Sequence, residues 1–342
     1  MIEIDGSEGE GGGQMLRTAL ALSAVTGRPF KFDNIRARRD RPGLAAQHLT
    51  GVKGVAEVCH ANVEGASVGS TSLTFEPGMV EAGDYRFDVG TAGSITLVLQ
   101  ACMLACARTR ARTDFDIIGG TNVRLSPPSD YLEYVLFPLL RTMGYEIDVK
   151  VPNRGFYPQG GGEMKVGMAR GEHILPLKLE KRGHFEGITG VCFTQKLPDH
   201  IAERMASTAR KSLVGHSPVK LVMDRRQGHS IGAGIFLAAV YENTVLGTDA
   251  LGEKGISSEK LGELAAISLI REMDSLETLD RHAADQILPY LSLAAGPSTF
   301  LVSELSMHFQ TQVQMIRKFL DVRIETEAVG DLFQVFVTPS HT

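Results

Sequence analysis

A glycine-rich stretch near the start of the chain is the first place where residue types suggest chemistry. Residues 5–13 read Asp-Gly-Ser-Glu-Gly-Glu-Gly-Gly-Gly, and a helical pattern begins at Gln14. A glycine run lets bare N–H groups approach a ligand, and a helix that follows directly presents its positive end to an anion. Gln14 and Arg17 are three residues apart and would share one helix face. The stretch indicates a phosphate site, although a glycine-rich turn without a ligand would read the same way.

Two carboxylates inside this loop restrict what it can bind. A loop of the G-x-x-x-x-G-K-[ST] type needs a lysine and a hydroxyl after its last glycine, whereas Gln14 and Met15 follow here. A dinucleotide fingerprint carries its acid about twenty residues further on, whereas Glu8 and Glu10 lie within this loop. Because carboxylates repel phosphate, we expect a divalent cation between Glu10 and any bound phosphate.

Basic residues and one histidine complete the candidate set. Arginines cluster at positions 36, 38, 39 and 41, and guanidinium forks suit phosphate oxygens, so we take Arg17, Arg36 and Arg39 as phosphate ligands. Of the ten histidines, His308 stands between an expected strand at 298–305 and an expected helix at 310–320, a junction of the kind that carries function. The set predicts phosphoryl or nucleotidyl transfer. Spacing does not decide whether the histidine is a general base or a nucleophile.

Composition sets the class of protein. A chain of 342 residues is long enough for about two domains. Its net charge of −5 means that a nucleic-acid partner would bind at a local basic site such as the arginine cluster. Neither a targeting segment nor a membrane-spanning apolar run is present, so we expect a soluble cytoplasmic protein. The four cysteines have neither disulfide nor zinc-site spacing, and we interpret all four as structural.

Three segments of the chain share one plan of helix, strand, loop, second helix and paired strands. This indicates an α/β (α+β) fold of three repeated βαβαββ-type subdomains around a pseudo-threefold axis. The expected helices are 14–24, 44–59, 94–107, 129–143, 283–295 and 310–320, and the expected strands are 30–35, 113–118, 298–305, 322–327 and 332–337.

Residues 185–275 follow a different plan and predict a small α/β domain inserted into the third repeat. The large three-repeat domain would then comprise residues 1–184 and 276–342. Within the insert we expect strands at 187–194, 219–223 and 234–245, and helices at 201–213 and 258–272.

Several short motifs are spread along essentially the whole chain. The most specific is residues 154–162, Arg-Gly-Phe-Tyr-Pro-Gln-Gly-Gly-Gly. The others are residues 9–14 with 16–17, 35–39, 42–44, 47–49, 92–94, 97–100, 119–121, 284–286 and 306–308. Together these motifs resemble the RNA 3'-terminal phosphate cyclase family. The resemblance implies a three-repeat fold like that of the enolpyruvyl transferases and of the C-terminal domain of translation initiation factor three, with a small α/β insert.

The resemblance also implies a reaction. His308 would attack the α-phosphate of ATP to give a histidine–AMP adduct, AMP would pass to the RNA 3'-phosphate, and the 2'-OH would displace it to leave a 2',3'-cyclic phosphate. The need for a 2'-OH implies an RNA partner. Glu10 would bind Mg²⁺ or Mn²⁺. The ATP contacts would be Gln14, Arg17, Gln100, His282, Ala283, Ala284, Asp285 and Gln286, and the RNA or phosphate contacts Arg36, Arg39 and Gln47.

Departures and alternatives complete these expectations. His282 stands where other members carry an aromatic residue, Asn122 replaces a common acid, and Val123 and Arg124 also differ. One alternative is an inactive cyclase-like ribosome-biogenesis factor, but such relatives lack the histidine. Another is an enolpyruvyl transferase, which should have six repeats. A homodimer is left open as the assembly.

Overall fold

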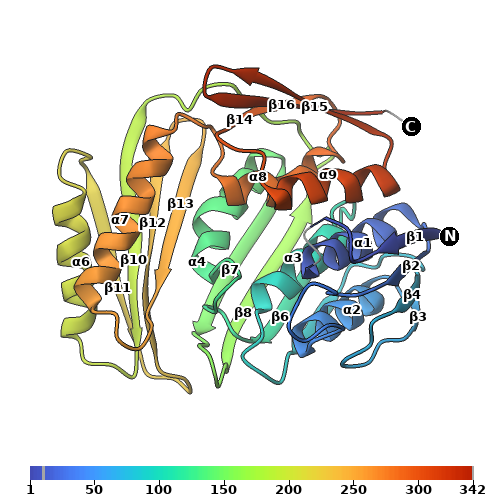
Figure 1. The fold of residues 1–342 in the computed structure, drawn as a ribbon, viewed down its shortest axis with the longest axis horizontal. Helices are drawn as coiled ribbons and strands as arrows, with labels where there is room; N and C mark the ends of the chain where they lie inside the picture. The colour runs from blue at the N-terminus through green and yellow to red at the C-terminus, as the bar shows by residue number, and fades with distance from the viewer. Residues whose placement is uncertain (10–11, 341–342) are drawn as a thin grey trace.

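Four mixed β-sheets of four strands each organise the part of the chain that the structure describes, with helices packed against them (Figure 1). The structure is a computed structural model and describes residues 1–9 and 12–340. The expected α/β class is therefore confirmed.

Three of the sheets share one strand order. In each, the first and second strands of the segment are parallel neighbours, the fourth strand pairs antiparallel with the second, and the third lies at the far edge. The sheets comprise β1 (Ile2–Asp5), β2 (Phe30–Asp33), β4 (Leu73–Glu76) and β3 (Asn62–Glu64); β5 (Asp84–Asp88), β6 (Thr113–Gly119), β8 (Gly162–Arg170) and β7 (Tyr145–Asn153); and β9 (Lys178–Leu179), β14 (Ser298–Val302), β16 (Leu332–Pro339) and β15 (Val322–Val329).

The fourth sheet has a different order and lies between β9 and β14 in the chain. It comprises β11 (Val219–Arg226), β10 (Phe185–Gln195), β12 (Gly232–Tyr241) and β13 (Val245–Leu251) in that order. The helices of this segment, α6 (His200–Ser212) and α7 (Ser258–Asp274), cover one face of the sheet (Figure 1).

The remaining helices pack on the first three sheets. They are α1 (Gly13–Thr26), α2 (Ala46–Val58), α3 (Ile95–Ala105), α4 (Ser129–Tyr131), the π-helical turn η1 (Leu132–Leu136), α5 (Phe137–Thr142), α8 (Arg281–Leu291) and α9 (Met307–Phe319). Helix α1 ends at Gly27, whose φ of 68° is the left-handed conformation that glycine tolerates, and the Gly27 N–H bonds to the Ser23 carbonyl. Helix α3 begins at Ser94, whose hydroxyl accepts from the Leu97 N–H.

The sequence located the helices to within a few residues but only half of the strands that the structure describes. It did not place β1, β3, β4, β5, β7, β8, β9 and β13. Three differences at the located elements have physical causes. The strand expected at 234–245 is confirmed over 234–241 but wrong at its end, because Glu242 and Asn243 form a tight turn between β12 and β13. Helix α9 begins earlier than expected, because Ser306 caps it by accepting from the Phe309 N–H. The expected helix 129–143 contains the π-turn, because Pro138 has no N–H for an α-helical bond to Tyr134.

Strand β12 is buried on both faces and joins two hydrophobic clusters. Ile235, Leu237 and Ala239 pack into the cluster that α6 and α7 cover, whereas Phe236 and Ala238 pack into the cluster of the other three sheets. Alternate side chains of a strand point to opposite faces, so one strand can serve both clusters. The fourth sheet thus packs against the rest of the molecule through the β12 side chains that point away from α6 and α7.

The specific motif at 154–162 lies at this junction. The Arg154 guanidinium makes a bidentate pair with Asp130, at 2.7 Å for each bond, and its Nε donates to Asp224 of β11 at 2.9 Å. It also stacks over the Phe193 ring of β10, 4.2 Å from the centroid. The motif therefore ties the fourth sheet to the second one.

Two further sequence expectations concern cysteines and membranes. Cys59, Cys102, Cys106 and Cys192 are all buried free thiols, which confirms the structural interpretation. Across residues 1–9 and 12–340, no helix is long and apolar enough to cross a membrane.

Candidate active site

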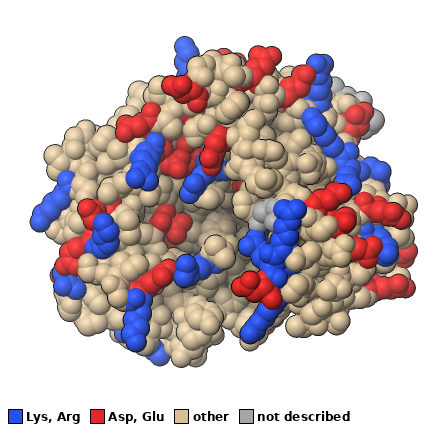
Figure 2. Space-filling model, in the orientation of Figure 1, with Lys and Arg blue, Asp and Glu red and all other residues tan. Residues whose placement is uncertain are grey.

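A pocket of about 610 Å³ opens where α1, α3, α8 and α9 meet the end of β13. The hollow at the centre of the face in Figure 2 has both basic and acidic side chains at its rim. Eight residues predicted from the sequence line the pocket, namely Gln14, Arg17, Arg39, Gln100, His282, Asp285, Gln286 and His308. Four helices and the arginine loop, all distant in sequence, thus bring the predicted residues together.

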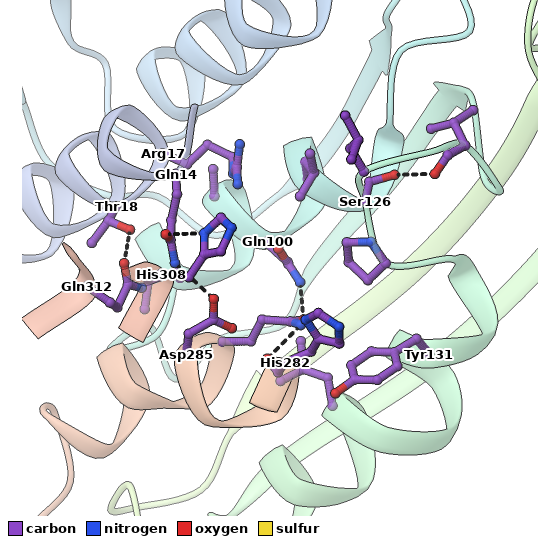
Figure 3. A pocket seen from close by; sticks show the side chains of 18 of the residues that line it. Gln14, Arg17, Thr18, Gln100, Ser126, Tyr131, His282, Asp285, His308 and Gln312 are labelled. Carbon is purple, nitrogen blue, oxygen red and sulfur yellow. Dashed lines mark hydrogen bonds between the residues drawn. The ribbon is translucent and has the colours of Figure 1, made fainter. Parts of the chain in front are cut away.

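A chain of hydrogen bonds orients His308 (Figure 3). Its Nδ1 lies 2.8 Å from Oε1 of Gln14, and Nε2 of Gln14 donates to Asp285 at 3.1 Å. Because an amide oxygen only accepts, Nδ1 carries the proton and the imidazole lone pair is on Nε2. The arrangement prepares Nε2 to act as a nucleophile or a base.

The Asp285 carboxyl has a raised pKa in this setting. Burial, and then the charge of Asp280, raise the pKa of Asp285 to about 7, although Arg17 and the bond from Gln14 oppose the rise. A carboxyl poised between its two protonation states near neutral pH is typical of functional sites.

Helix α8 supplies further polar groups to the pocket. Gln100 donates to Gln286, and Gln286 donates in turn to the His282 carbonyl at 2.8 Å. The His282 ring meets Tyr131 edge to face, with 6.4 Å between centroids, and burial lowers the pKa of His282. Ala283 and Ala284 are buried in the helix and do not line the pocket.

A basic cluster surrounds the start of α1. A methyl group built at Gly13 would lie 2.4 Å from Nε2 of His48 and 3.0 Å from Nη1 of Arg17, so only glycine fits there. Burial, and then Arg17, Arg36 and Arg39, lower the pKa of His48 to about 3. Arginines and a helix N-terminus together form an anion site.

His48 is the site residue that the sequence reasoning missed. It is 8% exposed, and within the described residues its Nδ1 has no hydrogen-bond partner. An orphaned buried nitrogen beside arginines suggests a group completed by a ligand. Its sequence signals are its position shortly after the arginine cluster and its place in the motif at 47–49.

The other predicted residues lie outside the pocket lining. Arg36 has a φ of 55° and donates to the Gly43 carbonyl at 2.8 Å, while the Gln47 side chain accepts from the Ser94 N–H at 2.8 Å. Glu10, the predicted metal ligand, lies outside the described residues. Neighbouring Gly9 accepts a bond from Arg38 at 2.8 Å, so the glycine loop and the arginine loop are in contact.

The residues that depart from the resemblance have clear positions. Asn122 accepts from Arg154 and donates to Asp130, so it belongs to the junction network. Arg124 lines the pocket mouth and pairs with Glu253 at 3.3 Å, which bridges the mouth from the loop after β6 to the segment after β13.

This site and fold define a class of protein. A mixed α/β fold holds a histidine with a fixed tautomer beside converging arginines and a helix N-terminus. Such a set can stabilise phosphate charge while the histidine bonds to or deprotonates a reacting group. The class is that of the phosphoryl or nucleotidyl transfer proteins.

Comparison with known proteins identifies the family. The model of the family described as RNA 3'-terminal phosphate cyclase matches residues 8–326. Proteins named RNA 3'-terminal phosphate cyclase are similar over nearly their whole length. The Nitrosospira multiformis protein is 43% identical over 99% of this chain and 97% of its own, and the Hyperthermus butylicus protein 44% over 93% and 91%. The Sulfurisphaera tokodaii protein is 45% identical over 95% and 96%. The chain belongs to the RNA 3'-terminal phosphate cyclase family.

Proposed function

We propose that the protein uses ATP to convert an RNA 3'-terminal phosphate into a 2',3'-cyclic phosphodiester, with His308 as the nucleophile. The observation that carries this proposal is the hydrogen bond from His308 Nδ1 to Gln14, because it leaves the lone pair on Nε2 in a pocket that Arg17 and Arg39 line. Membership of the cyclase family gives the reaction class.

In the first step, Nε2 of His308 attacks the α-phosphorus of ATP. An N–P bond forms, the bond to the β-phosphate oxygen breaks, and pyrophosphate leaves with the electron pair. In the adduct, Nδ1 of the imidazole keeps its proton and still donates a hydrogen bond to the Gln14 oxygen. Arg17 and Arg39 lie at the pocket wall where phosphate charge would need compensation.

In the second step, an oxygen of the RNA 3'-phosphate attacks the adenylyl phosphorus and releases His308. In the third, the ribose 2'-OH attacks the 3'-phosphorus, loses its proton and expels AMP, which closes the cyclic ester. The covalent relay divides one difficult activation into easier transfers.

The pocket suggests a division of labour among its residues. We assign the nucleoside of ATP to the side formed by Gln100, His282, Asp285 and Gln286, with Ala283 and Ala284 as the buried backbone that holds them. We assign phosphate and RNA contacts to Gln14, Arg17, Arg36, Arg39, Gln47 and His48. The position of both His48 and Arg17 beside Gly13 supports placing His48 in the second group.

The cyclisation chemistry also calls for a divalent cation, Mg²⁺ or Mn²⁺, which would neutralise phosphate charge on the bound nucleotide. Glu10 is our candidate ligand, because its oxygen chemistry suits a hard cation. Within the described residues, no cluster of three metal-ligating side chains offers another site.

We further infer that the first three sheets are repeats around a pseudo-threefold axis and that residues 185–275 form an inserted domain. The shared strand order of three sheets supports the repeats. A separate hydrophobic cluster under α6 and α7 supports the insert, with residues 1–184 and 276–342 as the large domain. Buried free thiols accord with the expected cytoplasmic location.

The deciding experiment is incubation with α-labelled ATP and Mg²⁺ or Mn²⁺. We expect an acid-labile, base-stable protein adduct in the wild type and in the surface control His173→Ala, and none in His308→Ala. A wild type that traps no label contradicts the covalent mechanism, and label on His308→Ala contradicts the residue. The competing function is that of an inactive ribosome-biogenesis factor. Such a protein would also trap no label as the wild type.

A further inference from the structure

Asp280 is a fully buried carboxylate directly before the helix that carries the nucleotide residues. Its Oδ1 accepts from the N–H groups of His282 at 3.0 Å and Ala283 at 2.9 Å, so it is the N-cap of α8. These two bonds alone would make it an ordinary helix cap.

Two further bonds connect Asp280 to other parts of the molecule. The Tyr131 hydroxyl donates to Oδ1 at 2.6 Å, and the Gly247 N–H of β13 donates to Oδ2 at 3.0 Å. Tyr131 precedes the π-turn that follows the second sheet's loop, and β13 belongs to the fourth sheet. One carboxylate therefore joins three separate parts of the fold.

Each joined element forms a wall of the pocket. Tyr131 itself lines it, α8 contributes His282, Asp285 and Gln286, and β13 contributes Asp249 and Leu251, which follow Gly247 by two and four residues. Figure 3 shows Tyr131 and His282 approaching each other at one end of this pocket. One side chain therefore bonds directly to both α8 and β13.

The energetics favour a rigid link. Burial raises the pKa of Asp280, but the donors from Tyr131, Gly247 and Ala283 favour its ionised form. Hydrogen bonds to an ionised group are about twice as strong as neutral ones, and leaving a buried donor unpaired is costly. Four donors on one carboxylate thus resist movement of any of the three walls.

We propose that Asp280 is a positioning residue, which holds α8, β13 and the segment of Tyr131 at the spacing that the nucleotide requires. It does not touch the nucleotide itself. This inference depends on the proposed function, because it takes the pocket as the ATP site.

Two substitutions each break one link and keep the helix cap. In Asp280→Asn an amide remains a good N-cap, but its single oxygen cannot accept from both Gly247 and the α8 amides, and its NH₂ group only donates. Tyr131→Phe removes the hydroxyl, keeps the ring against His282 and leaves the carboxylate charge in place. We expect each variant to raise the Kd for ATP about tenfold, the loss expected for one bond to a charged group. The rate of adduct formation at saturating ATP should change less than about threefold.

The matched control is Ser257→Ala. Ser257 caps α7 by accepting from the Lys260 N–H at 3.2 Å, on an exposed surface that does not line the pocket. Its loss should lower the melting temperature without changing the Kd for ATP. Hydrogen exchange at the Gly247 amide should accelerate in Asp280→Asn and stay unchanged in Ser257→Ala.

The outcomes separate the possibilities. If both test variants lose stability but keep the wild-type Kd, Asp280 is only a helix cap and the proposal is wrong. If Asp280→Asn weakens ATP binding and Tyr131→Phe does not, ATP binding depends on the charge of Asp280 and not on the spacing of the pocket walls. That outcome also overturns the proposal. Should Asp280→Asn fail to fold, Tyr131→Phe decides the question. A wild type that binds no ATP contradicts the proposed function instead. In that case the bond between Asp280 and β13 is still tested, because unchanged hydrogen exchange at the Gly247 amide in Asp280→Asn would refute it.

Discussion

The imidazole of His48 is held neutral by its surroundings. It is buried among Arg17, Arg36 and Arg39, and its pKa falls from 6.5 to about 3. A neutral ring can lie close to guanidinium groups and still accept a hydrogen bond. A neutral His48 therefore adds no fourth positive charge to the three arginines of the cluster.

A pH dependence of stability follows. Between pH 6.5 and about pH 3, His48 binds a proton in the unfolded chain but not in the folded chain. The free energy of unfolding therefore falls as the pH falls through this window. The penalty approaches several kcal/mol, on the order of 1.4 kcal/mol for each pH unit in the window. We expect His48→Gln to make the free energy of unfolding decline less steeply between pH 6.5 and 4 in urea titrations.

The control for this prediction is His173→Gln, which changes an exposed histidine. Its free energy of unfolding should follow the wild-type curve at every pH. A wild-type slope in His48→Gln would show that His48 is protonated in the folded protein.

Residue types in the sequence predicted some residues of the candidate site but not others. Gln14, Arg17 and His308 could be found because glycine loops, arginines and a histidine at a helix start have chemical signatures in sequence. His48 could not, because its role depends on the space that Gly13 leaves in three dimensions. Arg36 was found from the arginine cluster and Gln47 by resemblance, yet their side chains bond to the backbone of Gly43 and Ser94, a role that composition cannot foresee.

At the scale of elements, local signals decided which boundaries could be predicted. Helix α1 has a glycine run before it and Gly27 after it, and its expected range was accurate. The turn between β12 and β13 was missed because apolar residues run continuously on either side of it. Strands buried on both faces lose the alternation by which a strand is recognised, so their ends depend on tertiary packing.

Two helical glycines make a matched test of whether the start of α1 is built for a ligand. Gly51 lies in the interior of α2, where a new methyl group meets nothing within 4 Å. Gly51→Ala should raise the free energy of unfolding by about 0.5–1 kcal/mol and leave activity unchanged. Gly13→Ala places a methyl group against His48 and Arg17. We expect it to slow cyclisation of a 3'-phosphate RNA about 10²-fold, because small displacements of positioning groups have such effects.

Rates of cyclic phosphate formation under saturating ATP check this pair. Wild-type rates in Gly13→Ala would mean that the His48 and Arg17 cluster is not part of the reaction site. A destabilised Gly51→Ala would mean that α2 is more tightly packed at this point than the structure indicates.

At the scale of the whole molecule, one ion network joins the fourth sheet to the rest. Arg154 and Asp130 are each 3% exposed, and Asp224 extends the network into β11. The pocket mouth depends on the same junction, because Arg124 on one side pairs with Glu253 on the other. Motif resemblance alone marked residues 154–162 as specific, whereas the reason for that specificity appears only when both sheets are seen together (Figure 1).

Removing Arg154 should therefore cost far more than removing a surface ion pair. Arg154→Ala leaves Asp130 buried and unpaired, and breaking a buried pair in this way costs about 3–5 kcal/mol. Arg323→Ala is the control, because its pair with Glu325 is exposed and should be worth less than about 1 kcal/mol. Adding Asp130→Asn to Arg154→Ala removes the stranded charge and should restore part of the loss, since neighbouring residues are not additive. Urea unfolding followed by circular dichroism measures all three. Equal losses in Arg154→Ala and Arg323→Ala would mean that the fourth sheet is held by the packing around β12 and not by this network.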